Sequence, residues 1–169
     1  ARELGQLDLL ARAYEQAVTM LSERINKAEL EGKSVPEDLD LRRAIRFEVA
    51  TLLRDELDRS LDAEKVFQAI LDNDEANQDA YEALDELLRA RGAHEEMMRL
   101  YRRRVDAIFD LDEQKVLLDR IVKIARHVLD DKATAIKTAE ELLDMVPEDL
   151  PTMELLAAMY EESDDSDKH

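Results

Sequence analysis

Histidine and acidic residues are the side chains of this sequence that could do metal chemistry, but their spacing does not favour it. The three histidines, His94, His127 and His169, lie far apart in the sequence. His127 is close to Asp130 and Asp131, and these three could hold a metal ion loosely. No second His or Cys lies near them, and the loops that bind hard cations follow a different pattern. We therefore interpret this group as a solvated helix end, and we predict no metal site and no cofactor.

Pairs of neighbouring acidic residues, such as Glu95–Glu96 and Glu140–Glu141, are the other candidates for chemistry. General acid–base catalysis needs a carboxyl group in a cleft that shifts its pKa. Adjacent side chains on a helix diverge, so these pairs share no such environment. The sequence also lacks a glycine-rich phosphate loop, an HExxH motif and a nucleophile beside a base. It therefore predicts that this segment is not an enzyme.

A cluster of arginines stands out against the acidic background, at Arg99 and at positions 102–104. These side chains could clamp an acidic or phosphorylated segment through paired hydrogen bonds. They could instead pair with Glu95, Glu96 and Asp106 at helical spacing along their own helix. We favour the second interpretation.

Acidic residues outnumber basic ones across the whole chain. The 169 residues include 42 Asp and Glu but 24 Lys and Arg, which gives a net charge of −18 at pH 7. Such a chain repels a phosphate backbone, so we expect no direct binding to nucleic acid. It attracts basic peptides or proteins, although the same charge could serve only to keep a helical surface in solution.

Compartment and membrane signals are few. The sequence contains no cysteine, which fits a reducing compartment and leads us to expect a cytoplasmic protein. No apolar run approaches the roughly 18–20 residues that a membrane span requires. The sequence begins with Ala1 rather than Met, inside a predicted helix, so we expect a segment of a longer protein.

The composition predicts helices joined by short loops, since only 3 Gly and 3 Pro are present and aromatic residues make up 4%. Pro36 and Pro151 suit the first turns of helices, and Gly32 and Gly92 suit the ends of the helices before them. We predict helices at about 7–31, 37–58, 60–73, 77–91, 93–110, 112–130, 132–145 and 150–161.

A repeat of 72 residues runs through the chain. Segments 49–84 and 121–156 align without a gap, so that Leu71 falls on Leu143. The identical pairs include Arg54/Arg126, Leu57/Leu129, Asp58/Asp130, Ala63/Ala135, Lys65/Lys137 and Leu84/Leu156. Each unit splits into two helical hairpins, and one hairpin alone cannot bury its apolar face. The repeat therefore predicts hairpins stacked in sequence order.

The segment that begins at Gln78 resembles a tetratricopeptide repeat. The residues that carry the likeness are Tyr81, Leu84 and Leu88 in a first helix, Gly92 at the turn, and Met97 and Tyr101 in a second helix. The likeness implies an all-α, right-handed superhelix of antiparallel hairpins with about eight helices. It also implies that Leu84 and Leu88 are buried between the fourth and fifth helices. Asp85 and Met97 replace the usual small residues, which implies looser helix contacts.

The resemblance implies one repeat domain over residues 1–161, followed by an acidic, disordered tail at 162–169. The predicted parts are an extended first hairpin at 7–58, repeats at about 43–77, 78–114 and 115–149, and a partial repeat at 150–161.

The first hairpin is longer than the others. Tyr14 precedes Leu53 by 39 positions, whereas the matching Tyr101 precedes Ala125 by 24. We predict that the extra residues extend the first helix, which could cover the next hairpin or protrude as a docking arm, and we favour the cover. No helix precedes the apolar strip of Leu7, Leu10, Tyr14 and Val18 within this chain. We expect a second copy of the chain to bury it in a homodimer, or else the extension of the same helix to fold over it.

In tetratricopeptide proteins the first helix of each hairpin lines a concave groove where partners usually bind. The likeness implies these groove positions here: Phe47, Thr51, Arg54 and Asp55 on the second helix, Glu82, Glu86 and Arg89 on the fourth, Asp119, Lys123, Arg126 and His127 on the sixth, and Glu154 and Glu161 on the eighth. The Lys and Asn set of the family's carboxylate clamp is missing, so binding of a chaperone C-terminus is not expected.

Three functions remain open at this point. The first is a scaffold that binds a partner peptide or helix in the groove. The second is a purely structural or self-associating segment of a longer repeat protein. The third is a scaffold subunit of an RNA-processing assembly, because half-a-tetratricopeptide-type repeats resemble the same pattern.

Overall fold

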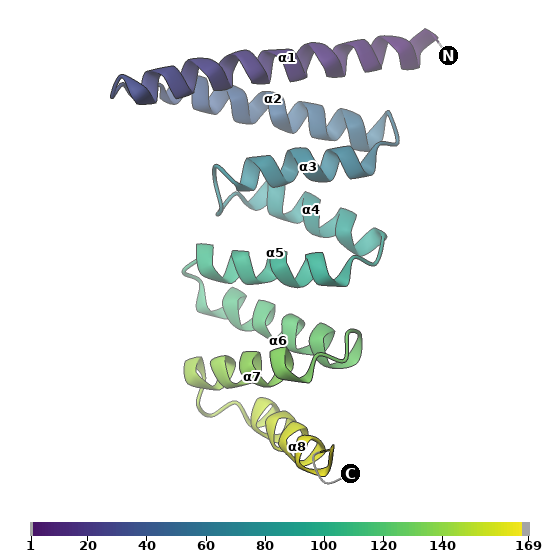
Figure 1. The fold of residues 1–169 in the computed structure, drawn as a ribbon, viewed down its shortest axis with the longest axis vertical. Coiled ribbons are helices and arrows are strands. Elements are labelled where there is room, and N and C mark those ends of the chain that lie inside the picture. The colour runs from purple at the N-terminus through teal and green to yellow at the C-terminus, as the bar shows by residue number, and fades with distance from the viewer. Residues whose placement is uncertain (1, 167–169) are drawn as a thin grey trace. The chain divides into compact units, whose positions relative to one another are not determined.

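A computed structural model describes residues 2–166 of the chain (Figure 1), and that range is folded into eight α-helices without a strand. The helices are α1 (Arg2–Leu30), α2 (Pro36–Asp55), α3 (Ser60–Leu71), α4 (Gln78–Ala90), α5 (His94–Ala107), α6 (Leu111–His127), α7 (Lys132–Met145) and α8 (Leu150–Ser166). The predicted all-α class and the eight helices are confirmed. Within the described range, none of the helices combines the length and the apolar character needed to cross a membrane.

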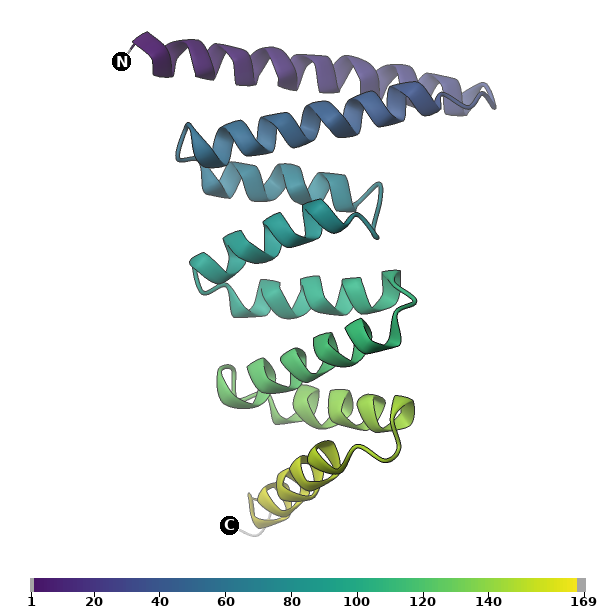
Figure 2. The same ribbon diagram turned by 180° about the vertical axis from the view of Figure 1, so that it is seen from behind.

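The chain forms two compact units, Ala1–Leu87 and Leu88–His169, and the boundary falls inside α4. In the first unit, α1 packs against α2 and α2 packs against α3. In the second unit, α5 packs against α6, α6 against α7, and α7 against α8. Figures 1 and 2 show that consecutive helices within each unit run in opposite directions. The predicted packing of consecutive antiparallel helices is therefore found, whereas a superhelix through both units stays a prediction.

The core of each unit is built from apolar side chains at helical spacing. In the first unit, Val49, Ala50 and Leu53 of α2 are buried together with Ala63 and Phe67 of α3. In the second unit, the cluster consists of Val122, Ala125, Ala135, Ala139 and Met159 from α6, α7 and α8. The alanines let neighbouring backbones approach closely, while the larger side chains fill the space between helices. Leu84 and Leu88 of α4 are each 3% exposed, as predicted for buried positions.

The predicted ends of the second and sixth helices, at 58 and 130, are each three residues too late. Asp58 and Asp130 have positive φ angles of 52° and 53°, which end a right-handed helix. The amide that follows each Asp donates back across the turn, from Arg59 N to Leu53 O and from Asp131 N to Ala125 O, both at 2.8 Å. Each donation reaches six residues back, and Asp occupies the left-handed position after the helix where Gly is usual.

The outer helices are longer than predicted. Helix α1 starts at Arg2 rather than at position 7 and continues to Leu30, so the extra residues of the first hairpin do extend this helix. At the other end, α8 continues to Ser166, so residues 162–166 of the predicted tail are helical. Residues 167–169 of that tail lie outside the described part of the chain.

Candidate functional site

The first group of predicted groove residues lies on α2. Phe47, Thr51 and Arg54 recur at i, i+4 and i+7, so they share one face of the helix, and all three are partly exposed. The ring of Phe47 packs edge-on against Phe67 of α3, with the ring centroids 5.4 Å apart. This face therefore offers one ring that is already packed and two polar side chains that reach solvent.

Arg54 is held by the residue next to it. Its Nε and Nη2 atoms donate to the two carboxylate oxygens of Asp55 at 2.5 and 3.0 Å. These hydrogen bonds raise the pKa of Arg54 and lower the pKa of Asp55. Glu86 of α4 lies near enough for its charge to raise the pKa of Arg54 further. Arg54 and Glu86, predicted positions on two helices of the first unit, are therefore close enough for their charges to interact.

The second group lies on α4, again at i, i+4 and i+7. Glu82, Glu86 and Arg89 are all exposed. Glu82 accepts a hydrogen bond from Gln78 Nε2 at 2.5 Å. Glu82 and Glu86 belong to the first unit and Arg89 to the second.

The third group lies on α6, in the second unit. Lys123 pairs with Asp119 one helical turn before it, with Nζ and Oδ2 2.6 Å apart. The Nη2 atom of Arg126 lies 2.7 Å from Oε1 of Glu162 on α8. His127 is exposed at the end of α6. The prediction named Glu161 on α8 and missed Glu162, which is the residue that Arg126 reaches.

The arginine cluster on α5 is used mainly between helices rather than along its own helix. Arg99 pairs with Glu95, as predicted, at 3.9 Å. Arg102 instead reaches Glu141 on α7, and Arg104 reaches Glu113 on α6. The prediction that the arginines pair along their own helix is therefore correct for Arg99. It is wrong for Arg102 and Arg104, which form ion pairs with residues of neighbouring helices.

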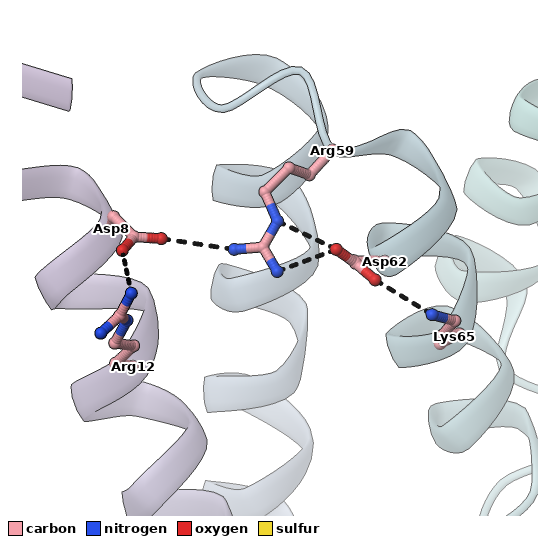
Figure 3. A network of polar contacts seen from close by, with 5 residues as sticks. All are labelled: Asp8, Arg12, Arg59, Asp62 and Lys65. Atoms are coloured by element: carbon pink, nitrogen blue, oxygen red, sulfur yellow. Dashed lines mark hydrogen bonds and ion pairs between the residues drawn. The ribbon is translucent and has the colours of Figure 1, made fainter. Parts of the chain in front are cut away.

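A chain of ion pairs, which the sequence did not reveal, joins α1 to the start of α3 (Figure 3). Asp8 of α1 accepts from Arg12 at 2.8 Å and from Arg59 at 3.4 Å. Arg59 and Lys65 both bind Asp62, at 2.8 and 3.1 Å. Lys65 and Arg59 together hold the pKa of Asp62 below its usual value. Only the pair of Asp8 and Arg59 joins residues far apart in the sequence, so the fold is needed to identify that link, whereas the other pairs are three or four residues apart.

The apolar strip of α1 is partly covered. Leu10 is 41% exposed, while Leu7, Tyr14 and Val18 are half-buried. The same helix buries Ala11, which is 1% exposed. The strip is thus neither fully open nor part of the core, and the predicted homodimer stays a prediction.

The predicted partner-binding residues form a separate, at least partly exposed face on each of α2, α4 and α6, and Arg54, Lys123 and Arg126 each lie beside a carboxylate. Among residues 2–166, no three Asp, Glu or His side chains come together in a way that could hold a metal ion. The order in which the helices pack is compatible with a helical repeat. No protein-family model matches the sequence, and no curated protein matches it either.

Proposed function

We propose that this chain is a tetratricopeptide-like repeat scaffold that binds a protein partner, as a peptide or a helix, along α2, α4 and α6. One observation carries the proposal. All ten predicted partner-binding residues reach the surface, and on each of the three helices three of them recur at i, i+4 and i+7. A polar stripe of this kind is what a helix offers when its other faces are used for packing.

The charges of these stripes suit reversible binding. Arg54, Lys123 and Arg126 each form an ion pair within the chain. Exposed ion pairs contribute little to stability, so a partner's charged groups can replace the pair of Lys123 and Asp119, whose side chains are 64% and 41% exposed, at small cost. The net charge of −18 steers basic segments toward the chain. We accordingly assign it a binding role rather than a catalytic one.

The 72-residue repeat supplies a matched pair of variants to test this role. Arg54 and Arg126 occupy equivalent positions on α2 and α6, and Lys65 and Lys137 occupy equivalent positions on α3 and α7. Each double alanine variant removes two positive charges. Peptides selected from a random library against the full chain serve as probes, and fluorescence anisotropy measures their affinity.

We expect Arg54→Ala with Arg126→Ala to weaken peptide binding by about tenfold or more, whereas Lys65→Ala with Lys137→Ala leaves it within about twofold. Equal effects of the two double variants would mean that binding depends on net charge alone. A larger effect of the Lys65 and Lys137 pair would place the binding surface on the odd-numbered helices and contradict the proposal.

Self-association is a second candidate, favoured by apolar exposure on α1. Leu4, Leu9 and Met20 are 54%, 66% and 67% exposed. Leu9 and Met20 lie on the same face of α1, and exposed apolar side chains that share a face can bind a partner, here a second copy of the chain. The net negative charge opposes this association, most strongly at low salt. Light scattering after size exclusion should show a dimer fraction that rises with salt concentration. A strict monomer at high salt would exclude self-association.

A further inference from the structure

A pocket of about 320 Å³ lies in the first unit, between the first half of α2 and the end of α3. Three apolar side chains line part of it. The polar lining consists of Asp40, Arg42, Arg43, Arg46, Asn73 and Asp74. None of the predicted groove residues lines this pocket, so it is a separate feature of the surface. Three arginines thus gather in one pocket of a chain whose net charge is −18.

The two aspartates of the pocket are both bound to the same arginine. Arg43 Nη2 lies 2.7 Å from Asp40 Oδ1, and Arg43 Nη1 lies 3.3 Å from Asp74 Oδ2. Arg43 is therefore neutralised from two sides. Neither carboxylate forms an ion pair with Arg42 or Arg46, the other two arginines of the pocket.

Arg42 is a buried cation whose partners are neutral. The residue as a whole is only 8% exposed. Nη2 donates to Asn73 Oδ1 at 2.6 Å, and Nη1 makes a long contact of 3.5 Å with Ser22 Oγ. Throughout the described residues, no carboxylate oxygen comes within ion-pair distance of Arg42. A buried charge without an opposite charge beside it is costly, so an anion bound at this position would be favourable.

Arg46 adds a second guanidinium one helical turn further along α2. Its Nη1 donates to the carbonyl oxygen of Ala69 at 3.1 Å. Burial lowers the pKa of Arg46, the charge of Arg42 lowers it further, and the nearby charge of Asp72 opposes both effects. Like charges at i and i+4 on a helix repel each other. An anion between the two arginines would remove this repulsion.

Asn73 holds the guanidinium of Arg42 and shares a carbonyl acceptor with that of Arg46. Its Oδ1 accepts from Arg42, while its Nδ2 donates to Ala69 O at 2.7 Å, the same carbonyl that accepts from Arg46. Both arginines are therefore anchored to the end of α3 through one short network. Each guanidinium has five N–H donors, so this anchoring leaves donors on both for a ligand.

We propose that this pocket binds an oxyanion, either a carboxylate or a phosphate group, between Arg42 and Arg46. The planar fork of a guanidinium matches two oxygens of such a group, and two forks held in place by Asn73 and by the carbonyl oxygen of Ala69 form a preorganised site. The apolar side chains of the pocket would contact the carbon atoms next to the anion. The competing explanation is that both arginines only stabilise the C-terminal end of α3, where cations are favourable.

The test follows the arginine side-chain Nε–H signals of the full chain by NMR, with inorganic phosphate replacing chloride at constant ionic strength and pH. Two further probes are a capped triglutamate peptide and the same peptide with phosphoserine at its centre. We expect saturable shifts at Arg42 and Arg46 and none at Arg59, which is already bound to Asp8 and Asp62. Saturation by phosphate alone identifies a free anion, and tighter saturation by a peptide identifies an anion carried on a polypeptide.

The variant Arg46→Gln should weaken the binding of the responding probe by about tenfold or more, and Arg59→Gln should leave it unchanged. If Arg46→Gln does not fold, Arg46→Lys keeps the charge but loses the fork, and it should also bind more weakly. The absence of saturable shifts at Arg42 and Arg46 with all three probes would overturn the proposal. So would an Arg46→Gln chain that folds and binds as tightly as the unchanged chain.

Discussion

Arg102 of α5 and Glu141 of α7 form an ion pair across two helices, with Nη1 of the arginine 2.6 and 2.8 Å from the two carboxylate oxygens. Nη2 of the same arginine lies 3.2 Å from the hydroxyl of Thr138, a residue only 1% exposed. Both charged side chains are about one-third exposed, so solvent screens part of their attraction. The pair ties an odd-numbered helix to the next odd-numbered helix of the same unit.

A double-mutant cycle on Arg102→Ala and Glu141→Ala should give a coupling free energy of about 0.5–1 kcal/mol at low salt. The pair of Arg99 and Glu95 is the matched control, since its atoms are 3.9 Å apart and its side chains are 68% and 71% exposed. We expect that control to show almost no coupling in urea unfolding. Equal coupling free energies in the two pairs would show that the closer contact between helices does not strengthen the ion pair.

Replacing Asp130 by glycine should stabilise the second unit. Asp130 holds a φ of 53°, a conformation that strains L-residues but not glycine. We expect Asp130→Gly to raise the free energy of unfolding by roughly 0.5–1 kcal/mol. The variant Asp130→Asn removes the same charge but keeps a side chain, so its free energy of unfolding should rise by less. If thermal unfolding shows the same gain in the free energy of unfolding for both variants, the cause is relief of charge repulsion and not relief of backbone strain.

The features that the sequence predicts well are those set by neighbours along the chain. The helices, the buried positions Leu84 and Leu88, and the lengthened α1 all follow from spacing within a few turns. The ends at 58 and 130 are misplaced because Asp is compatible with a helix by pattern, while its left-handed backbone depends on the turn that follows. Contacts such as Arg42 with Asn73 join residues 31 positions apart on different elements. Periodicity contains no information about which polar side chains meet at that distance.

Leu84→Ala should destabilise the chain strongly, because Leu84 is 3% exposed and its removal leaves a cavity. The typical cost of such a truncation is about 2–5 kcal/mol. The matched control is Leu61→Ala on α3, since Leu61 is 61% exposed. That variant should change the free energy of unfolding by no more than roughly 0.5 kcal/mol. A Leu84→Ala chain that unfolds at the same urea concentration as the parent would mean that the repeat register is wrong.

Acid should weaken the start of α8 through Asp149. This carboxylate binds Lys115 Nζ at 2.6 Å and accepts from the hydroxyl and the amide of Thr152 at 2.5 and 3.2 Å. Lys115 first, and then Thr152, hold the pKa of Asp149 below its usual value. A lowered folded-state pKa means that the stabilisation is complete well above the unfolded value of about 3.9 and is lost as pH falls through the folded-state pKa.

Urea unfolding between pH 6 and pH 3 measures this effect. The Asp149→Asn variant should lose less stability than the parent over that range, because it has no proton to take up at this site. Glu148→Gln is the control, since Glu148 is the exposed neighbour and should leave the pH profile as it is. A parallel loss of stability in the parent and in Asp149→Asn would rule out this role for Asp149.

The most direct test of the proposed scaffold is a map of where a bound peptide touches the full chain. A peptide selected against the chain is titrated into the isotope-labelled protein, and backbone NMR shifts are recorded for every helix. We predict that the largest shifts fall on α2, α4 and α6, around Thr51, Glu86 and Lys123, before any appear on the odd-numbered helices. Shifts confined to α3, α5 and α7 would contradict it.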